Sequence, residues 1–159
     1  MPAAGPGTPP PCRPARPEEA GTLRDLVRAA YARWVPVIGQ EPAPMNDDYA
    51  ARIAAGEAFV LDGPDGAPLG VLVLEDDPPE SLAVDNVALA PAAQGMGLGR
   101  ALMDFAEAEA RRRGRRRLRL YTNAAMEANI RLYERLGFAV TRRAEEKGFR
   151  RVFMEKPLA

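Results

Sequence analysis

The chain has 159 residues, of which 47% are hydrophobic and 28% are charged, as is typical of one globular domain. Its 22 basic and 22 acidic residues cancel, so net charge gives no argument for binding to nucleic acid. The absence of histidine and the single cysteine, Cys12, exclude histidine triads, histidine metal sites, thiolate clusters and internal disulfides. An enzyme of this composition would rely on carboxylates, tyrosines, amides and the main chain.

The N-terminal stretch MPAAGPGTPPPCRPARP is rich in proline and glycine and lacks the apolar segment of a secretory signal. We expect residues 1–11 to form a flexible tail and residues 12–159 to form a single domain. Apolar runs stay well below the ~20 residues of a membrane span. We therefore expect a cytoplasmic protein with no membrane partner.

The first part of the chain predicts two helices. Pro17, followed by two glutamates, opens the first one, because proline fits the first turn and acidic groups favour the positive end of the helix dipole. Apolar residues recur at helical spacing from Leu23 to Trp34, and Pro36 should end this helix. The second helix should begin at a cap, Asn46 or Asp47, and end at Gly56.

The period of the pattern then changes to that of strands. Residues 57–61 and 68–75 flank the turn DGPDG and predict a β-hairpin. Residues 81–90 predict a third strand, closed by Pro91. A helix should run from Leu98 to near Gly114.

The C-terminal part alternates strands with one more helix. A strand is expected over 117–122 and a helix over 123–137, capped by Thr122 or Asn123. Gly137 should end that helix, with Phe138 folding back on Tyr133 in a Schellman-type end. A final pair of strands is expected over 138–142 and 151–156.

The segment QGMGLGRALM (94–103) places three glycines just before a helix. It lacks the lysine of a P-loop and the third glycine of the dinucleotide fingerprint, so both motifs are excluded. Two interpretations stay open. The segment is either a slack connection, or a strand–turn–helix corner whose bare backbone N–H groups bind an anion with help from the helix dipole.

A resemblance to a known family favours the second interpretation. Residues 94–99, QGMGLG, match the Gln/Arg-x-x-Gly-x-Gly/Ala signature of the GCN5-related N-acetyltransferases (the GNAT superfamily). The block LYTNAAMEANIRLYERLGF (120–138) and the closing RRVFMEKPL are similar to later blocks of the same family. The resemblance extends from about Cys12 to Leu158.

The resemblance implies an α/β fold built on a mixed, strongly twisted sheet. The implied order is strand, two helices, three strands, helix, strand, helix and two strands. The fourth and fifth strands, 81–90 and 117–122, would be parallel and splay apart to admit acetyl-CoA. The family's cofactor residues then fall on the backbones of Val87 and Leu89, on the loop Gln94, Gly95, Met96, Gly97, Leu98, Gly99 and Arg100, and on Asn129 and Tyr133.

The implied reaction is direct transfer of an acetyl group to a primary amine of a small molecule or a protein in a ternary complex. Tyr133 matches the family's general acid, and its ordinary pKa, near that of a thiol, suits donation to the coenzyme A sulfur. Asn129 precedes it by one helical turn and would bind the cofactor arm. The backbone N–H of Val87 is the implied oxyanion donor. The alternative for Tyr133 is a core tyrosine packed on Phe138.

The general base and the amine pocket are less sharply defined by the sequence. Asp85 is the first candidate base and Glu75 the second, although each also fits a solvated acid at a strand end. The amine acceptor would meet the first two helices and their loop, where the aromatic and apolar candidates also fit the core: Tyr31, Trp34, Met45 and Tyr49.

The run RRRGRRR (111–117) has three interpretations: cations at a helix end, a contact to the 3′-phosphate of coenzyme A, or a nucleic-acid patch. Zero net charge and the lack of interleaved aromatics disfavour the last. We therefore expect an acetyl-CoA-dependent N-acetyltransferase, monomeric or homodimeric, with no metal and no nucleic-acid partner. A non-catalytic acyl-CoA-binding module is the alternative.

Overall fold

The computed structural model describes residues 12–159, so the predicted tail of residues 1–11 lies outside the described residues. The strands are β1 (Cys12–Pro14), β2 (Ala58–Asp62), β3 (Pro68–Asp77), β4 (Ser81–Leu89), β5 (Arg117–Asn123), β6 (Ala139–Glu146) and β7 (Phe149–Pro157). The helices are α1 (Ala20–Tyr31), α2 (Val35–Ile38), α3 (Tyr49–Ala54), α4 (Leu98–Arg112) and α5 (Glu127–Arg135), and short 3-10 turns lie at Pro17–Glu19, Ala32–Trp34, Ala43–Asn46 and Pro91–Ala93.

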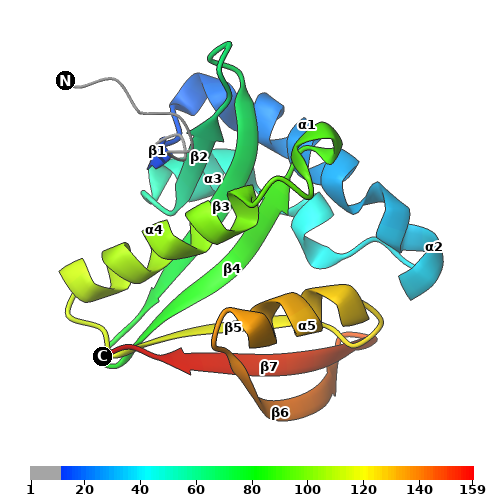
Figure 1. The fold of residues 1–159 in the computed structure, drawn as a ribbon. Helices are drawn as coiled ribbons and strands as arrows, with labels where there is room; N and C mark the ends of the chain where they lie inside the picture. The colour runs from blue at the N-terminus through cyan, green and yellow to red at the C-terminus, as the bar shows by residue number, and fades with distance from the viewer. Residues whose placement is uncertain (1–11) are drawn as a thin grey trace.

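These strands form one mixed sheet in the order β1-β2-β3-β4-β5-β7-β6 (Figure 1). β4 and β5 are parallel, and the other neighbouring strands are antiparallel. The mixed α/β sheet predicted from the sequence is therefore confirmed, with its elements in the expected order.

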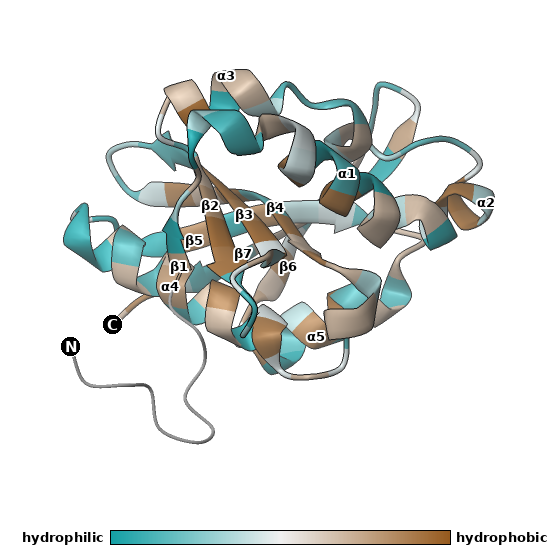
Figure 2. Ribbon diagram, turned by 90° about the horizontal axis from the view of Figure 1, so that it is seen from above, coloured by the Kyte–Doolittle hydropathy of each residue, from teal (hydrophilic) through white to brown (hydrophobic). Residues whose placement is uncertain are grey.

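Helices cover both faces of the sheet (Figure 2). On one face, α4 and α5 pack against a core that includes Leu72, Leu102 and Leu118. On the other, α1 and α3 enclose a smaller core around Leu23 and Val71. Alternation along the strands places successive side chains in the two cores, which explains the runs of consecutive apolar residues in β2 and β3.

A β-bulge in β4 changes which face its side chains meet. Opposite β3, Val73 pairs with Asn86 and Leu74 pairs with Val84, so Asp85 is the extra residue. Val84 packs in the α4 core before the bulge, and Val87 does so after it. The bulge thus turns Asp85 and Asn86 both away from α4, an arrangement that regular alternation would not allow.

Three local predictions are wrong in detail. The chain stays helical past Pro36, because Pro36 occupies the first turn of the short helix α2, where its missing N–H costs nothing. Asp48, rather than Asn46 or Asp47, caps α3 by accepting from the Ala51 N–H at 3.1 Å. Asn123 accepts from the Ala125 N–H at 2.9 Å in a turn, so α5 begins only at Glu127.

The predicted end of α5 is confirmed. Gly137 has a φ of +99°, and its N–H donates to the Glu134 carbonyl at 3.0 Å. The Phe138 N–H donates to the Tyr133 carbonyl, also at 3.0 Å, and the two rings lie 5.9 Å apart. This hydrogen-bond pair is the Schellman motif. It fixes the position of Tyr133 on the helix relative to the sheet.

The described helices are all too short or too polar to cross a lipid bilayer. Cys12 lies in β1, where burial and Asp62 raise the pKa of its thiol to about 11. A thiol with that pKa stays protonated near neutral pH and is a poor nucleophile.

Candidate active site

The sheet opens between β4 and β5. The two strands pair at only three positions, Ser81 with Arg117, Leu82 with Leu118 and Ala83 with Arg119. Beyond Ala83 they diverge, so the edge of β4 that faces β5 has no strand partner. This splay is the opening that the family resemblance predicted.

Three cavities follow one another through the opening. We call them the loop cavity (about 220 Å³), which reaches Gln94, Gly95 and Gly99; the central cavity (about 60 Å³); and the outer cavity (about 340 Å³), beside β6 and β7. The loop and central cavities share Tyr133 and Asn129, and the central and outer cavities share Asp85 and Arg151. Two ligands, one in the loop cavity and one in the outer cavity, could therefore meet in the central cavity.

The glycine loop presents a row of free donors. The N–H groups of the six residues 95–100 donate no hydrogen bond to any described residue, and α4 has no side-chain cap. An uncapped helix of 15 residues also concentrates the positive end of its dipole there. Such an arrangement can bind an anion, such as a diphosphate.

Two of the glycines are required by backbone conformation. Gly95 and Gly97 have φ values of +83° and +78°, and a Cβ added at either would meet no atom within 4 Å. Gly99 differs, since it has no positive φ and its added Cβ would lie 3.8 Å from Leu89 Cδ1. The space beside the loop is thus open to a ligand.

The free edge of β4 offers main-chain groups to the opening. The Leu89 carbonyl accepts from Gln94 Nε2 at 3.2 Å, and the Val87 carbonyl accepts from the Tyr31 hydroxyl at 3.5 Å. Both carbonyls therefore turn away from β3. A ligand arm lying along this edge could pair with Val87 and Leu89 as a strand would.

Tyr133 lies at the boundary of the loop and central cavities, with Asn129 one turn earlier on α5. Burial raises the pKa of the Tyr133 phenol to about 12, so the group is protonated at neutral pH. Its ring also packs on Phe138, as the core interpretation predicts, and the same residue lines both cavities, as the site interpretation requires.

Asp85 faces the central and outer cavities and is held by Arg52 of α3, whose Nη2 donates to Asp85 Oδ2 at 2.9 Å. Arg52 also pairs with the carboxylates of Asp47, Glu57 and Glu75. Burial, and then the neighbouring acids, raise the pKa of the Asp85 carboxyl despite the attraction of Arg52. A raised carboxyl pKa brings a candidate base closer to neutral pH.

The other candidate acceptor residues separate into two groups. Tyr31 lines both the loop and central cavities, and its hydroxyl donates to Asn86 Oδ1 at 2.9 Å. Trp34 lines the loop cavity. Met45 and Tyr49 are buried and line neither; Tyr49 instead accepts from Asn86 Nδ2 at 3.1 Å and supports the floor of the site.

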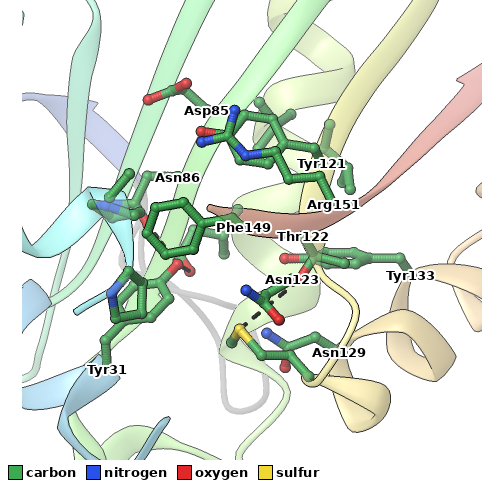
Figure 3. Close-up of a pocket in the computed structure, with 17 residues that line it drawn as sticks. Tyr31, Asp85, Asn86, Tyr121, Thr122, Asn123, Asn129, Tyr133, Phe149 and Arg151 are labelled. Atoms are coloured by element: carbon green, nitrogen blue, oxygen red, sulfur yellow. Dashed lines mark hydrogen bonds between the residues drawn. The ribbon is translucent and has the colours of Figure 1, made fainter. Parts of the chain in front are cut away.

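The central cavity has further polar and aromatic walls beyond the residues predicted from the sequence. Tyr121 and Asn123 of β5 and Phe149 and Arg151 of β7 line this cavity together with Asp85, Asn129 and Tyr133 (Figure 3). The alternation of β5 could have indicated Tyr121. Arg151 had no such signal, because only the return of β7 beside β5 brings it to the opening.

The arginine run is neutralised by ion pairs. Each of its arginines lies within 4 Å of a carboxylate: Arg111–Glu107, Arg112–Glu109, Arg113–Glu109, Arg115–Asp76, Arg116–Glu80 and Arg117–Glu155. This pattern fits the interpretation of a solvated helix end. In the part of the chain that the structure describes, no cluster of three or more acidic, cysteine or histidine side chains is arranged to hold a metal ion.

Comparison with known proteins decides the family. A profile of the acetyltransferase (GNAT) family matches residues 23–138, which include the glycine loop, β4, β5 and α5. This chain belongs to the GNAT family. Among curated proteins, it is 44% identical over 77 residues to mycothiol acetyltransferase of Geodermatophilus obscurus. That match covers 48% of this chain and only 24% of the relative.

Solved structures of GNAT proteins have the same fold. A nourseothricin acetyltransferase is 30% identical, with a TM-score of 0.60, over 64% of this chain and 65% of its own. PaiA N-acetyltransferase from Thermoplasma acidophilum, in complex with coenzyme A, has a TM-score of 0.78 over 92% of this GNAT chain and 98% of its own, at 19% identity. The second likeness extends the agreement in fold to nearly the whole chain.

Proposed function

We propose that this GNAT protein transfers an acetyl group from acetyl-CoA to a primary amine, and that residues 12–159 act as one acetyltransferase domain. The observation that carries the proposal is the row of free N–H groups over 95–100, which opens onto the same cavity as Tyr133. An anion site and a protonated phenol at one opening of the sheet meet the needs of a reaction with a diphosphate-bearing thioester.

Acetyl-CoA would supply an acyl group already activated as a thioester. The N–H groups from Gly95 to Arg100, with Gln94 at the entrance, would bind its diphosphate. The main-chain edge at Val87 and Leu89 would pair with the pantetheine arm, and Asn129 would hold that arm from α5. These contacts fix the thioester at the central cavity, where positioning alone can supply several kcal/mol.

The remaining residues transfer protons and stabilise the charge that develops during the reaction. The new bond joins the amine nitrogen to the acyl carbon, while the carbon–sulfur bond breaks. The Tyr133 hydroxyl donates its proton to the departing sulfur, and the Val87 N–H faces the oxygen on which negative charge develops. Asp85 accepts the proton that the amine loses. All electrons and protons are thereby accounted for without a covalent enzyme species.

Gly99→Val tests the cofactor half of this proposal. Gly99 lies in the first turn of α4 with ordinary backbone geometry, so valine adds bulk to the loop cavity without the strain that it would meet at Gly97. We expect calorimetric titration to show acetyl-CoA binding to the wild type and a loss of at least about 10-fold in affinity for the variant. Equal affinity in the two proteins would refute the loop as the diphosphate site.

Turnover distinguishes the enzyme from the binding module. Release of free coenzyme A in the presence of a panel of primary amines is expected from the enzyme. A protein that binds acetyl-CoA tightly and acetylates none of them would be the non-catalytic module instead.

A further inference from the structure

The lining of the central cavity carries few charged side chains. Asp85 and Arg151 supply the only carboxylate and the only cation in the lining of the central cavity, as far as the described residues show. The same two side chains also line the outer cavity. An amine acceptor reaching the thioester through either cavity therefore passes both.

Arg151 is held rigidly by its neighbours. Its Nη1 donates to Glu146 Oε2 at 3.0 Å, and its guanidinium carbon lies 4.3 Å from the centre of the Tyr121 ring and 5.7 Å from that of Phe149. The side chain is only 11% exposed, whereas Arg119 and Arg142, which also line the outer cavity, are 48% and 58% exposed. Stacking and burial thus fix one guanidinium in position before any ligand arrives.

Part of this guanidinium has no protein partner. Only Nη1 makes a side-chain hydrogen bond within residues 12–159, which leaves the N–H groups on Nε and Nη2 unused. Among the same residues no buried side-chain nitrogen or oxygen lacks a partner, so these N–H groups must face open space. The open space next to Arg151 is the central and outer cavities, at the end where Asp85 and Tyr121 lie (Figure 3).

We propose that Arg151 determines the acceptor class of this enzyme by binding a carboxylate on the acceptor, so that the preferred substrates are amino carboxylates of the amino-acid type. The inference rests on the proposed acetyl transfer. A planar guanidinium with adjacent free N–H groups matches a carboxylate in shape and charge. The amine of the same molecule would then lie toward Asp85.

The surroundings of Asp85 suit the amine of such an acceptor. Asp85 accepts a hydrogen bond from Arg52, but Arg52 is shared with the carboxylates of Asp47, Glu57 and Glu75, so negative charge is in excess there. Aromatic walls from Tyr31, Tyr121 and Phe149 further suit an acceptor with an apolar side chain.

The test compares matched acceptors. Each proteinogenic amino acid is assayed beside its carboxamide and its decarboxylated amine, with acetyl-CoA binding measured separately by calorimetry. We expect the best amino acid to exceed its carboxamide in kcat/KM by about 10-fold or more, the usual effect of a charge-assisted hydrogen bond. Arg151→Gln should bring the ratio of kcat/KM between amino acid and carboxamide close to one, and Arg151→Lys should retain part of the preference. Both variants should bind acetyl-CoA like the wild type.

Arg150→Gln is the matched control. Arg150 is the preceding residue on β7, is exposed and lines neither the central nor the outer cavity, so the ratio should not change. The inference is overturned if amides or simple amines are preferred, if Arg151→Gln keeps the ratio, or if acetyl-CoA binds and no amino acid is acetylated. Failure of acetyl-CoA to bind would instead overturn the proposed function itself.

Discussion

At the residue scale, the packing of Tyr133 can be separated from its proposed role as an acid, because its ring packs on Phe138 while the residue lines the central cavity. Tyr133→Phe keeps the ring and removes only the hydroxyl group. We expect kcat to fall by about 10²-fold or more, as for the loss of a general acid, with the affinity for acetyl-CoA unchanged. Steady-state kinetics and calorimetry on the same preparation check this. A kcat equal to that of the wild type would show that another group protonates the sulfur.

The raised pKa of Asp85 leads to a prediction about how kcat/KM depends on pH. A base acts only when ionised, and burial raises the pKa of Asp85, so kcat/KM should fall as pH drops through that raised pKa, above the ordinary aspartate range near 4. Several groups surround the carboxyl: Arg52 and Asp47 near α3, Glu57 before β2, Glu75 of β3, and Tyr121 and Arg151 across the opening.

The matched variant for this profile is Asp85→Asn. This substitution should lower kcat/KM by about 10²-fold and remove the fall of kcat/KM at acidic pH that the ionisation of Asp85 causes. The dependence on pH that comes from the amine substrate's own titration should remain in the wild type and in the variant. If the variant keeps the wild-type fall at acidic pH and the wild-type rate, the reaction proceeds without Asp85 and the amine loses its proton to water.

At the scale of elements, the end of α5 depends on a single conformation. Gly137 has a φ of +99°, and an added Cβ would lie 3.1 Å from Lys156 Cε. Gly137→Ala should therefore lower the free energy of unfolding by about 1–3 kcal/mol, measured by urea denaturation. Gly21→Ala in α1, where the conformation is helical and no atom lies within 4 Å, should instead raise it by about 0.5 kcal/mol. Equal effects at both sites would contradict the strain argument.

The elements themselves could be predicted from the sequence because local signals agree with the fold. Helical spacing of apolar residues marks α1 and α4, and Gly137 with Phe138 marks the end of α5. The bulge at Asp85 could not be predicted, because it depends on the register of β3 against β4. Arg151 was missed for a related reason, since a strand residue reaches the site only through pairing distant in sequence.

The two capping errors have a common physical cause. Asn46, Asp47 and Asp48 are all good caps, and sequence alone does not say which one has the extended backbone that a cap needs. At Asn123 the side chain serves a turn instead of a helix. The later start of α5 changes the lining of the site, because Asn123 and Met126 are left outside the helix and line the central cavity.

At the scale of the whole molecule, the opening divides the sheet into two parts. β1–β4 carry the glycine loop and most of the helices, and β5–β7 carry α5, while the strands β4 and β5 join the parts through three residue pairs only. A ligand held by Gly95–Arg100 on one side and Asn129 and Tyr133 on the other would bridge them. Binding to the native state alone should then stabilise the whole fold.

This linkage gives a quantitative expectation. At a concentration 100 times its Kd, acetyl-CoA should add about 2.7 kcal/mol to the free energy of unfolding, which corresponds to a rise in Tm of about 5–10 °C for a domain of this size. Gly99→Val should have a Tm near that of the unliganded wild type and should show little of this rise, because its loop cavity is filled. Scanning calorimetry at several ligand concentrations checks both, and a Tm that does not depend on acetyl-CoA would contradict a ligand bridging the two parts of the sheet.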